Sequence, residues 1–323
     1  MDDYFFDNQK IEPGVSGEGD SLPPSKGALP TGFVQAGELV SESEWGKINV
    51  NEIQGITHSE THWYISTQWE LFKISRESFP RVDAHVHLLA FRKFLKGGWY
   101  RHFGGIVHDN GLIYIATTGR THALTTERAT PIVVVLNANL EFVKYGFFPR
   151  EVQNNAAWVG FNPVTQHLYS SRGVQELLEY DPEFANGDTI KLIQRHRMHY
   201  VDADVSSREW DNVVSQGGAF STSGLFYYVV DKKDSRDHAF TGIHGFELRD
   251  GDYHEFEISG VNNKGEDTKF IGIKYVGDNE NHDRLWEMED ITVVRENENE
   301  FIYHLQLHNG KPDFARVVRY RLM

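Results

Sequence analysis

The chain of 323 residues is predicted to be an all-β protein, folded as a single five-bladed β-propeller with room for a sixth blade between residues 259 and 285. Three observations favour this class: a short phrase recurs five times, strand-like alternation runs from Val50 onward, and sustained helical periodicity is lacking. Self-similarity at about 40–50 residues with several strands per repeat is typical of propeller blades. A parallel α/β fold would instead need a helix between successive strands.

Each copy of the phrase places a polar residue four positions before an apolar centre. The copies lie 50 to 72 residues apart and span Glu52–Ile56, His102–Ile106, Asn155–Val159, Ser215–Ala219 and Glu287–Ile291. If the blades close into a ring, their innermost strands line one channel and the leading residues converge at one mouth. The phrase therefore predicts an axial column of Glu52, His102, Asn155, Ser215 and Glu287.

The individual strands follow from runs rich in Val, Ile, Tyr and Phe, which suit a pleated, half-buried surface. In the first two blades we expect strands at 53–59, 62–68, 70–75, 82–91, 102–109, 111–119, 132–140 and 142–148. In the third and fourth we expect them at 158–163, 167–172, 177–182, 190–196, 217–222, 225–231, 244–250 and 253–258. The fifth offers only 289–294, 300–308 and 316–322.

Turn and terminal segments complete this organisation. Asn110-Gly111 and Asp250-Gly251 are strong hairpin signals. Residues 1–45 are rich in Gly, Ser and Pro and should form an extended N-terminal arm, while 46–323 form the propeller domain. Because the fifth blade is short of a strand, an N-terminal strand could complete the ring.

Bulk composition excludes several classes of function. The net charge is −15, with 47 acidic against 32 basic residues, which disfavours nucleic acid and anionic membrane surfaces as partners. The absence of cysteine excludes disulfides, thiolate zinc sites and cysteine nucleophiles. No signal peptide and no run of about 18 apolar residues is visible. We expect a cytoplasmic protein, or a secreted one if a leader has been removed, and the oligomeric state stays open.

The axial column suggests two kinds of cation. Carboxylate, amide and hydroxyl oxygens suit Ca²⁺, whereas His102 with Glu52 and Glu287 would suit a transition metal. Strand alternation would send Glu287 and Glu289 to one face and Asp290 to the other. Two nearby carboxylates perturb each other's pKa, as a general acid or base requires. Equally, the column could only cap strands and hold channel water.

Three segments resemble a known family. Trp286–Ile291, Asn155–Trp158 and Ser215–Phe220 are similar to the last-, third- and fourth-blade phrases of the calcium-activated nucleotidases, or apyrases. The resemblance implies a five-bladed propeller over residues 50–323, with calcium in the channel held partly by Ser and Glu side chains of inner strands. His102 departs from the pattern, because the family has an acid there, and no basic residues match those that would hold phosphates.

Other candidates lie outside the column. Asp83-Ala-His85-Val-His87 matches the metal-binding first strand of amidohydrolases. An outer blade strand with one solvent-exposed face would account for the same residues. The basic stretch Arg195–His199 could meet an anion or form a solvated edge strand. Three tryptophans offer stacking surfaces for a ligand, or core packing for the blades: Trp99, Trp158 and Trp210.

The favoured function is metal-dependent, hydrolase-like chemistry on a small-molecule substrate at the channel mouth. Glu52, Glu287 and His102 would hold the ion or activate water, and Glu289 or Asp290 would act as the general base. Two alternatives remain: a non-catalytic lectin-like or protein-binding propeller, and a metal-independent biosynthetic enzyme that binds an apolar substrate in the same funnel. The substrate cannot be read from the sequence, since propeller loops vary freely over one scaffold.

Overall fold

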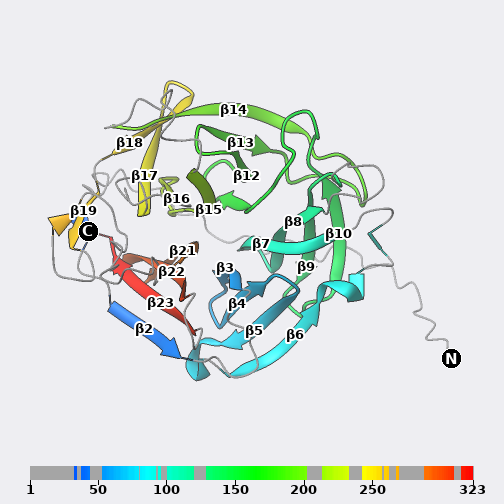
Figure 1. The fold of residues 1–323 in the computed structure, drawn as a ribbon, viewed down its shortest axis with the longest axis horizontal. Helices are drawn as coiled ribbons and strands as arrows, with labels where there is room; N and C mark the ends of the chain where they lie inside the picture. The colour runs from blue at the N-terminus through cyan, green and yellow to red at the C-terminus, as the bar shows by residue number, and fades with distance from the viewer. Residues whose placement is uncertain are drawn as a thin grey trace, which may run out of the picture.

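The chain forms a ring of antiparallel β-sheets around a central axis (Figure 1). The computed structural model describes residues 33–34, 38–43, 53–79, 81–91, 94–95, 100–119, 129–201, 213–232, 242–256, 258–261, 267–268, 287–308 and 314–322. Every structural statement below concerns these residues. The all-β propeller class predicted from the sequence is confirmed.

Five four-stranded units, here called blades, can be followed in the described residues. Blade 1 contains β3 (Ile53–His58), β4 (His62–Thr67), β5 (Glu70–Ser75) and β6 (Val82–His87). Blade 2 contains β7 (Tyr100–Asp109), β8 (Leu112–Gly119), β9 (Ile132–Asn137) and β10 (Phe142–Phe147). Two short 3₁₀ helices, η2 (Arg76–Ser78) and η3 (Leu88–Phe91), flank β6.

Blades 3 and 4 belong to one continuous sheet of eight strands. Blade 3 contains β11 (Gly160–Asn162), β12 (His167–Arg172), β13 (Glu176–Tyr180) and β14 (Leu192–His199). Blade 4 contains β15 (Val213–Phe220), β16 (Phe226–Lys232), β17 (Gly242–Arg249) and β18 (Asp252–Phe256). The outermost strands β14 and β18 pair in parallel and thereby join the two blades.

Blade 5 is completed by the N-terminal segment. Its strands are β21 (Glu287–Glu296), β22 (Asn299–His308), β23 (Phe314–Arg321) and β2 (Glu38–Ser43). β2 pairs antiparallel with β23, which confirms the expectation that an N-terminal strand supplies the missing fourth strand. Part of the predicted arm is therefore a propeller strand.

Local sequence explains the hairpins that connect the strands. Asn110 and Gly111 both have positive φ, of 44° and 78°, and Asp250 and Gly251 follow the same pattern at 52° and 91°. Two consecutive residues with positive φ form the turn that matches the right-handed twist of the strands it joins. Both predicted hairpins are thus confirmed.

Hydrophobic side chains form separate cores between neighbouring blades. One cluster joins blades 5 and 1, and others join blades 1 and 2, 2 and 3, 3 and 4, and 4 and 5. Each blade therefore packs on two neighbours, as closure of a ring requires. The first strand of each blade lies near the axis and the fourth at the rim (Figure 1).

A small sheet lies outside the ring of blades. It consists of β1 (Phe33–Val34), β19 (Ser259–Val261) and β20 (Asp267–Thr268), with β1 parallel to β19. The remainder of the stretch where a sixth blade was considered lies outside the described residues. Among the described residues, no helix has the length and apolar character needed to cross a membrane.

Candidate channel-mouth site

The repeated phrase coincides with β-bulges in the innermost strands. Pairing with the second strand is irregular between Ile53 and Gly55, between Phe103 and Ile106, between Ser215 and Gly217, and between Met288 and Ile291. A bulge leaves residues of the strand unpaired and re-aims their groups, and it is common next to functional sites. Here the bulges direct backbone groups of several blades toward the axis.

Asp290 receives these backbone groups at the axis. Its side chain is buried, and its Oδ2 atom accepts hydrogen bonds from the backbone N–H groups of Ile56 at 3.3 Å and Ile106 at 3.1 Å. The N–H groups of Gly218 and Ile291 also donate to the carboxyl group. A single side chain of blade 5 thus binds the inner strands of blades 1, 2 and 4 and its own strand.

The electrostatics of Asp290 reflect two opposing effects. Burial raises the pKa of this carboxyl group well above its ordinary value, whereas the four backbone N–H groups favour the ionised form. All four groups are donors, so each of them is satisfied only by an acceptor. The arrangement makes Asp290 an internal anchor of the ring and keeps it away from solvent.

Glycines allow the inner strands to approach this closely. A Cβ atom at Gly217 would overlap Asp290 Oδ1, and one at Gly104 would overlap the carbonyl oxygen of Ala157. A Cβ at Gly105 would lie 2.6 Å from Cβ of Trp158. The inner strands are therefore closely packed around Asp290.

His102 lies at the mouth between two glutamine side chains. Its Nε2 atom is 2.5 Å from Oε1 of Gln54, whose own Nε2 donates to the carbonyl oxygen of Ile53 at 2.7 Å. Gln68 Nε2 donates to His102 Nδ1 at 3.4 Å. Because Gln54 Oε1 can only accept, the His102 nitrogen that faces it, Nε2, donates in this contact. A metal at His102 would have to displace one of these amides.

Ser215 and Trp158 are bonded to each other. The indole N–H of Trp158 donates to Ser215 Oγ at 2.6 Å and to Ser171 Oγ at 3.0 Å. Tyr228 donates its hydroxyl to Ser171 Oγ at 3.2 Å and to the carbonyl oxygen of Gly173 at 2.8 Å. Trp158 is fully buried and belongs to the core between blades 3 and 4. It therefore corrects the expectation of a stacking surface, because no face of the indole is open to a ligand.

The two acids that follow Glu287 lie in the bulge of β21. Glu289 and Asp290 are both buried, at 3% and 1% exposure. The bulge between Met288 and Ile291 takes both residues out of the regular pairing, so the two-residue period that would separate their side chains does not apply. Asp290 is an anchor of the inner strands, and Glu289 is the carboxyl group next to it.

Several predicted site residues cannot be compared with this geometry. Glu52, Trp99 and Trp210 lie outside the described residues, as does the side chain of Glu287, whose backbone begins β21. Asn155 is described and exposed. Within the described part of the chain, no group of three or more His, Asp or Glu side chains is arranged to hold a metal ion. The calcium site remains a prediction.

The histidine motif of blade 1 lies on an outer strand. Its residues lie on β6, where Asp83 accepts a hydrogen bond from the backbone N–H of Ser75 at 2.7 Å and His85 Nδ1 is 3.2 Å from Glu70 Oε1. His87 stacks on Trp69 with ring centroids 6.3 Å apart. These contacts agree with the interpretation as an outer blade strand.

Two features of the candidate site were not predicted from the sequence. Gln54 and Gln68 clamp His102, yet Gln68 lies in the loop between β4 and β5, outside the phrase. Asp290 occupies the phrase position held by Gly55, Gly105 and Gly218 in other blades. That substitution of an acid for glycine at a crowded position is the sequence signal that could have identified the anchor.

Comparison with known proteins adds similarities of chain layout. No family model and no curated protein matches the sequence. An exo-1,5-α-L-arabinanase from a bovine ruminal metagenomic library has 12% identity and a TM-score of 0.44, covering 84% of this chain and 93% of that chain. Cellvibrio cellulosa α-L-arabinanase has 10% identity and a TM-score of 0.46, covering 84% and 91%.

A third solved structure is also similar in chain layout. The β-propeller domain of Cps50 (Swd1) from Myceliophteria thermophila has 8% identity and a TM-score of 0.39, covering 82% of this chain and 83% of that chain. At such identities and TM-scores, these likenesses carry no statement about activity. The resemblance to the calcium-activated nucleotidases therefore stays a prediction.

Proposed function

We propose that the chain is a hydrolase-type enzyme that acts on a small polar ligand at the mouth of its channel. The observation that carries the proposal is the buried Glu289 next to the anchored Asp290 on the inner strand of blade 5. Acid–base catalysis needs a carboxyl group held in a fixed position and shielded from bulk water. Glu289 is buried and lies in the bulge of β21.

In this proposal each side chain has a separate task. Glu289 takes a proton from a water molecule that attacks the scissile bond and returns it to the leaving group, so that the proton count is conserved. His102, which contacts Gln54 and Gln68, offers an oriented polar group to the ligand. Asp290 is a positioning residue, because its carboxyl group binds the backbone N–H of Ile291 and those of inner-strand residues in three other blades.

A second candidate function is ligand binding without catalysis. It is favoured by the two glutamine side chains that contact His102, those of Gln54 and Gln68. Amide and imidazole groups can donate and accept hydrogen bonds, as recognition of hydroxyl or amide groups requires. A lectin-like module would need no more than this.

The test is a screen of phosphate esters, glycosides and lactones, with and without divalent cations. We expect turnover in the wild type, loss of turnover in Glu289→Gln, and wild-type turnover in Glu151→Gln, which changes an exposed acid in the same way. Equal turnover in all three proteins would contradict the role of Glu289. Saturable binding without turnover, weakened by Gln54→Ala and not by Glu289→Gln, would favour the binding module.

A further inference from the structure

Blade 5 contains two buried polar groups that have no hydrogen-bond partner among the described residues. They are Nε2 of His304 in β22 and the hydroxyl group of Tyr320 in β23. Both side chains are buried, at 0% and 1% exposure. Buried polar groups are nearly always paired in folded proteins, and an unpaired one often marks the place of a water molecule or an ion.

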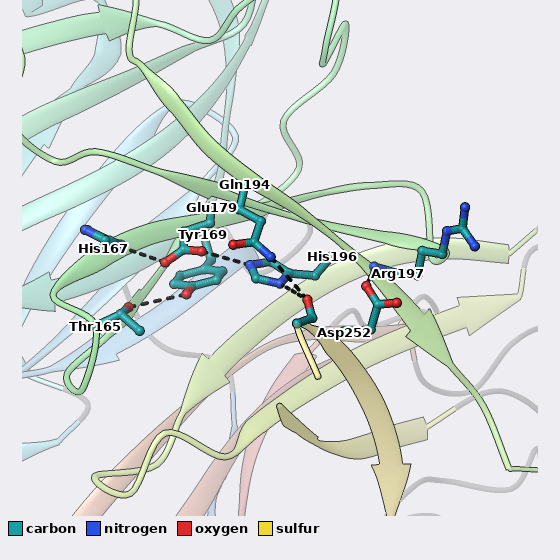
Figure 2. Close-up of polar contacts among 9 residues, drawn as sticks. Thr165, His167, Tyr169, Glu179, Gln194, His196, Arg197 and Asp252 are labelled. Carbon is teal, nitrogen blue, oxygen red and sulfur yellow. Dashed lines mark hydrogen bonds and ion pairs between the residues drawn. The ribbon is translucent and has the colours of Figure 1, made fainter. Parts of the chain in front are cut away.

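His196 in blade 3 shows how a buried histidine is ordinarily satisfied. Its Nε2 atom is 2.8 Å from Oε2 of Glu179 (Figure 2), and its Nδ1 atom is 2.6 Å from the carbonyl oxygen of Gly251. Both ring nitrogens of His196 thus have an oxygen atom within hydrogen-bond distance. His304 is equally buried, but in the described part of the chain only its Nδ1 atom has a partner.

The contacts of Gln306 determine where the His304 ring carries its proton. Arg316 Nε donates to Gln306 Oε1 at 2.6 Å, and because arginine can only donate, this bond fixes the orientation of the amide. The NH₂ group of Gln306 then lies 2.8 Å from His304 Nδ1 and can only donate, so Nδ1 accepts. The ring is therefore neutral, and its single proton is on Nε2.

The strand register places the Tyr320 side chain beside that of His304. β22 and β23 pair antiparallel, and Tyr320 lies two residues along β23 from Val318, which is opposite His304. Residues two apart share a face of the sheet, and diagonal neighbours on one face are within reach of an aromatic side chain. Gln306 partly offsets the rise that burial causes in the pKa of Tyr320, so its amide is close to the hydroxyl group.

The charge next to both groups is positive. Burial and the guanidinium of Arg316 lower the pKa of His304 to about 3. Burial raises the pKa of Tyr320 to about 12, and the charge of Arg316 opposes this rise. Among the described residues, Arg316 is thus the charged group that acts on both His304 and Tyr320. A positive charge beside two hydrogen-bond donors favours a negatively charged acceptor.

The neighbouring side chains on this face of the sheet are apolar. Tyr320 belongs to the core between blades 4 and 5, together with Ile302 and Val318. A water molecule between His304 and Tyr320 could accept two hydrogen bonds, but its own hydrogens would need acceptors that aliphatic side chains do not offer. A halide ion accepts hydrogen bonds and has none to donate.

We propose that blade 5 binds a small monovalent anion, of the size of chloride, between Nε2 of His304 and the hydroxyl group of Tyr320. The imidazole N–H and the phenol O–H donate to the anion, and the guanidinium of Arg316 supplies the compensating charge. His304 and Gln306 lie opposite Ile291 and Met288, the two residues between which β21 bulges. The anion therefore stabilises the strand pair behind this bulge, independently of the proposed hydrolase activity.

The ion is identified directly by crystallography of the wild-type protein soaked in sodium bromide. We expect an anomalous difference peak between His304 Nε2 and the Tyr320 hydroxyl group. A density peak without anomalous signal would identify a water molecule and overturn the proposal, and so would the lack of any peak. This measurement requires no substitution, so it decides the point even if variants at these positions fail to fold.

Binding in solution is tested by urea denaturation as a function of chloride, with sodium gluconate keeping the ionic strength constant. We expect saturable stabilisation, with the equilibrium constant of unfolding lowered about 100-fold when chloride is at 100 times its Kd. Tyr320→Phe removes one donor and keeps the ring, so the affinity for chloride should fall about tenfold or more.

The matched control is Tyr303→Phe. The Tyr303 hydroxyl group is on the other face of the same sheet and donates to Glu296 Oε1 at 2.7 Å, so this variant should keep the wild-type affinity for chloride. A wild-type stability that does not respond to chloride would overturn the proposal. An equal loss of the response in both variants would overturn it as well, because the effect would then not depend on the face that carries His304.

Discussion

Replacement of Asp290 by alanine should destabilise the protein more than replacement of any exposed carboxylate. The substitution leaves four backbone N–H groups without an acceptor, those of Ile56, Ile106, Gly218 and Ile291. Each buried, unsatisfied N–H costs about 1–3 kcal/mol, so the total is about 4–12 kcal/mol. Domains are stable by only about 5–15 kcal/mol, and Asp290→Ala should therefore be largely unfolded or close to it.

Asp290→Asn gives a graded version of the same test. Asparagine keeps the volume of the side chain and one acceptor oxygen, but its NH₂ group must face backbone N–H donors. If two of the four backbone hydrogen bonds are lost, the free energy of unfolding falls by about 2–6 kcal/mol. The unfolding entropy is about 2.1 cal/mol/K per residue, so a loss of about 3 kcal/mol lowers the melting temperature of the 323-residue chain by about 4–5 °C. Urea denaturation and calorimetry measure both quantities.

The control for these variants is Asp83→Ala. Asp83 also accepts a backbone hydrogen bond, from Ser75 at 2.7 Å, but its side chain is 32% exposed and water can replace it. We expect a loss of less than about 1 kcal/mol there. If Asp290→Ala and Asp83→Ala unfold at the same urea concentration, the carboxyl group at the axis is not an anchor.

The anchor should also have a pH signature. Because burial raises the pKa of Asp290, the folded protein binds a proton that the unfolded chain releases above its ordinary value of 3.8. The folded state binds more protons in that window, so this group's contribution to stability falls as pH rises from 3.8 toward the raised value. Asp290→Asn should remove this slope, and an unchanged slope would assign it to another group.

Two further substitutions or treatments test other parts of the ring. Burial and the charge of Arg316 lower the pKa of His304 to about 3, so stability should fall by up to about 1.4 kcal/mol per pH unit as pH drops from 6.5 to 3. His304→Gln should flatten this acid limb in calorimetry, whereas His85→Gln, at an exposed ring, should not. If the predicted cation binds, Ca²⁺ should raise the melting temperature and a chelator lower it. The double variant Glu52→Gln, Glu287→Gln should abolish that response, and a melting temperature indifferent to chelator would leave both acids with a structural role.

Local signals predicted most of the fold. Alternation located the strands of blades 1 and 2, and the Asn-Gly and Asp-Gly pairs located two hairpins, because these features are determined by neighbouring residues. The seam between blades 3 and 4 was not predicted, since the parallel pairing of β14 with β18 joins strands that no turn connects. Parallel pairing of distant strands leaves no pattern in either segment alone.

The phrase located the inner strands of blades 1, 2, 4 and 5, whereas the place and the roles of the site residues remain predictions. A carboxylate that binds a metal and one that binds backbone amides are the same residue type in a sequence. Asp290 could be told apart only by its bulge and by the glycines around it, which are features of tertiary packing. For the same reason Trp158 could not be assigned to the core before its indole was seen bonded to Ser215.

The pairing of β2 with β23 has a consequence for how the chain is made. Glu38 lies opposite Arg319, so the ring joins residues from the two ends of the sequence. During synthesis from the N-terminus, β2 leaves the ribosome long before its partner exists and must remain unpaired until the last strand emerges. Contacts between distant residues are slow to form, and an unpaired strand invites pairing with other chains. The ring can therefore first close when β23 has emerged, and not when any one of the earlier blades folds.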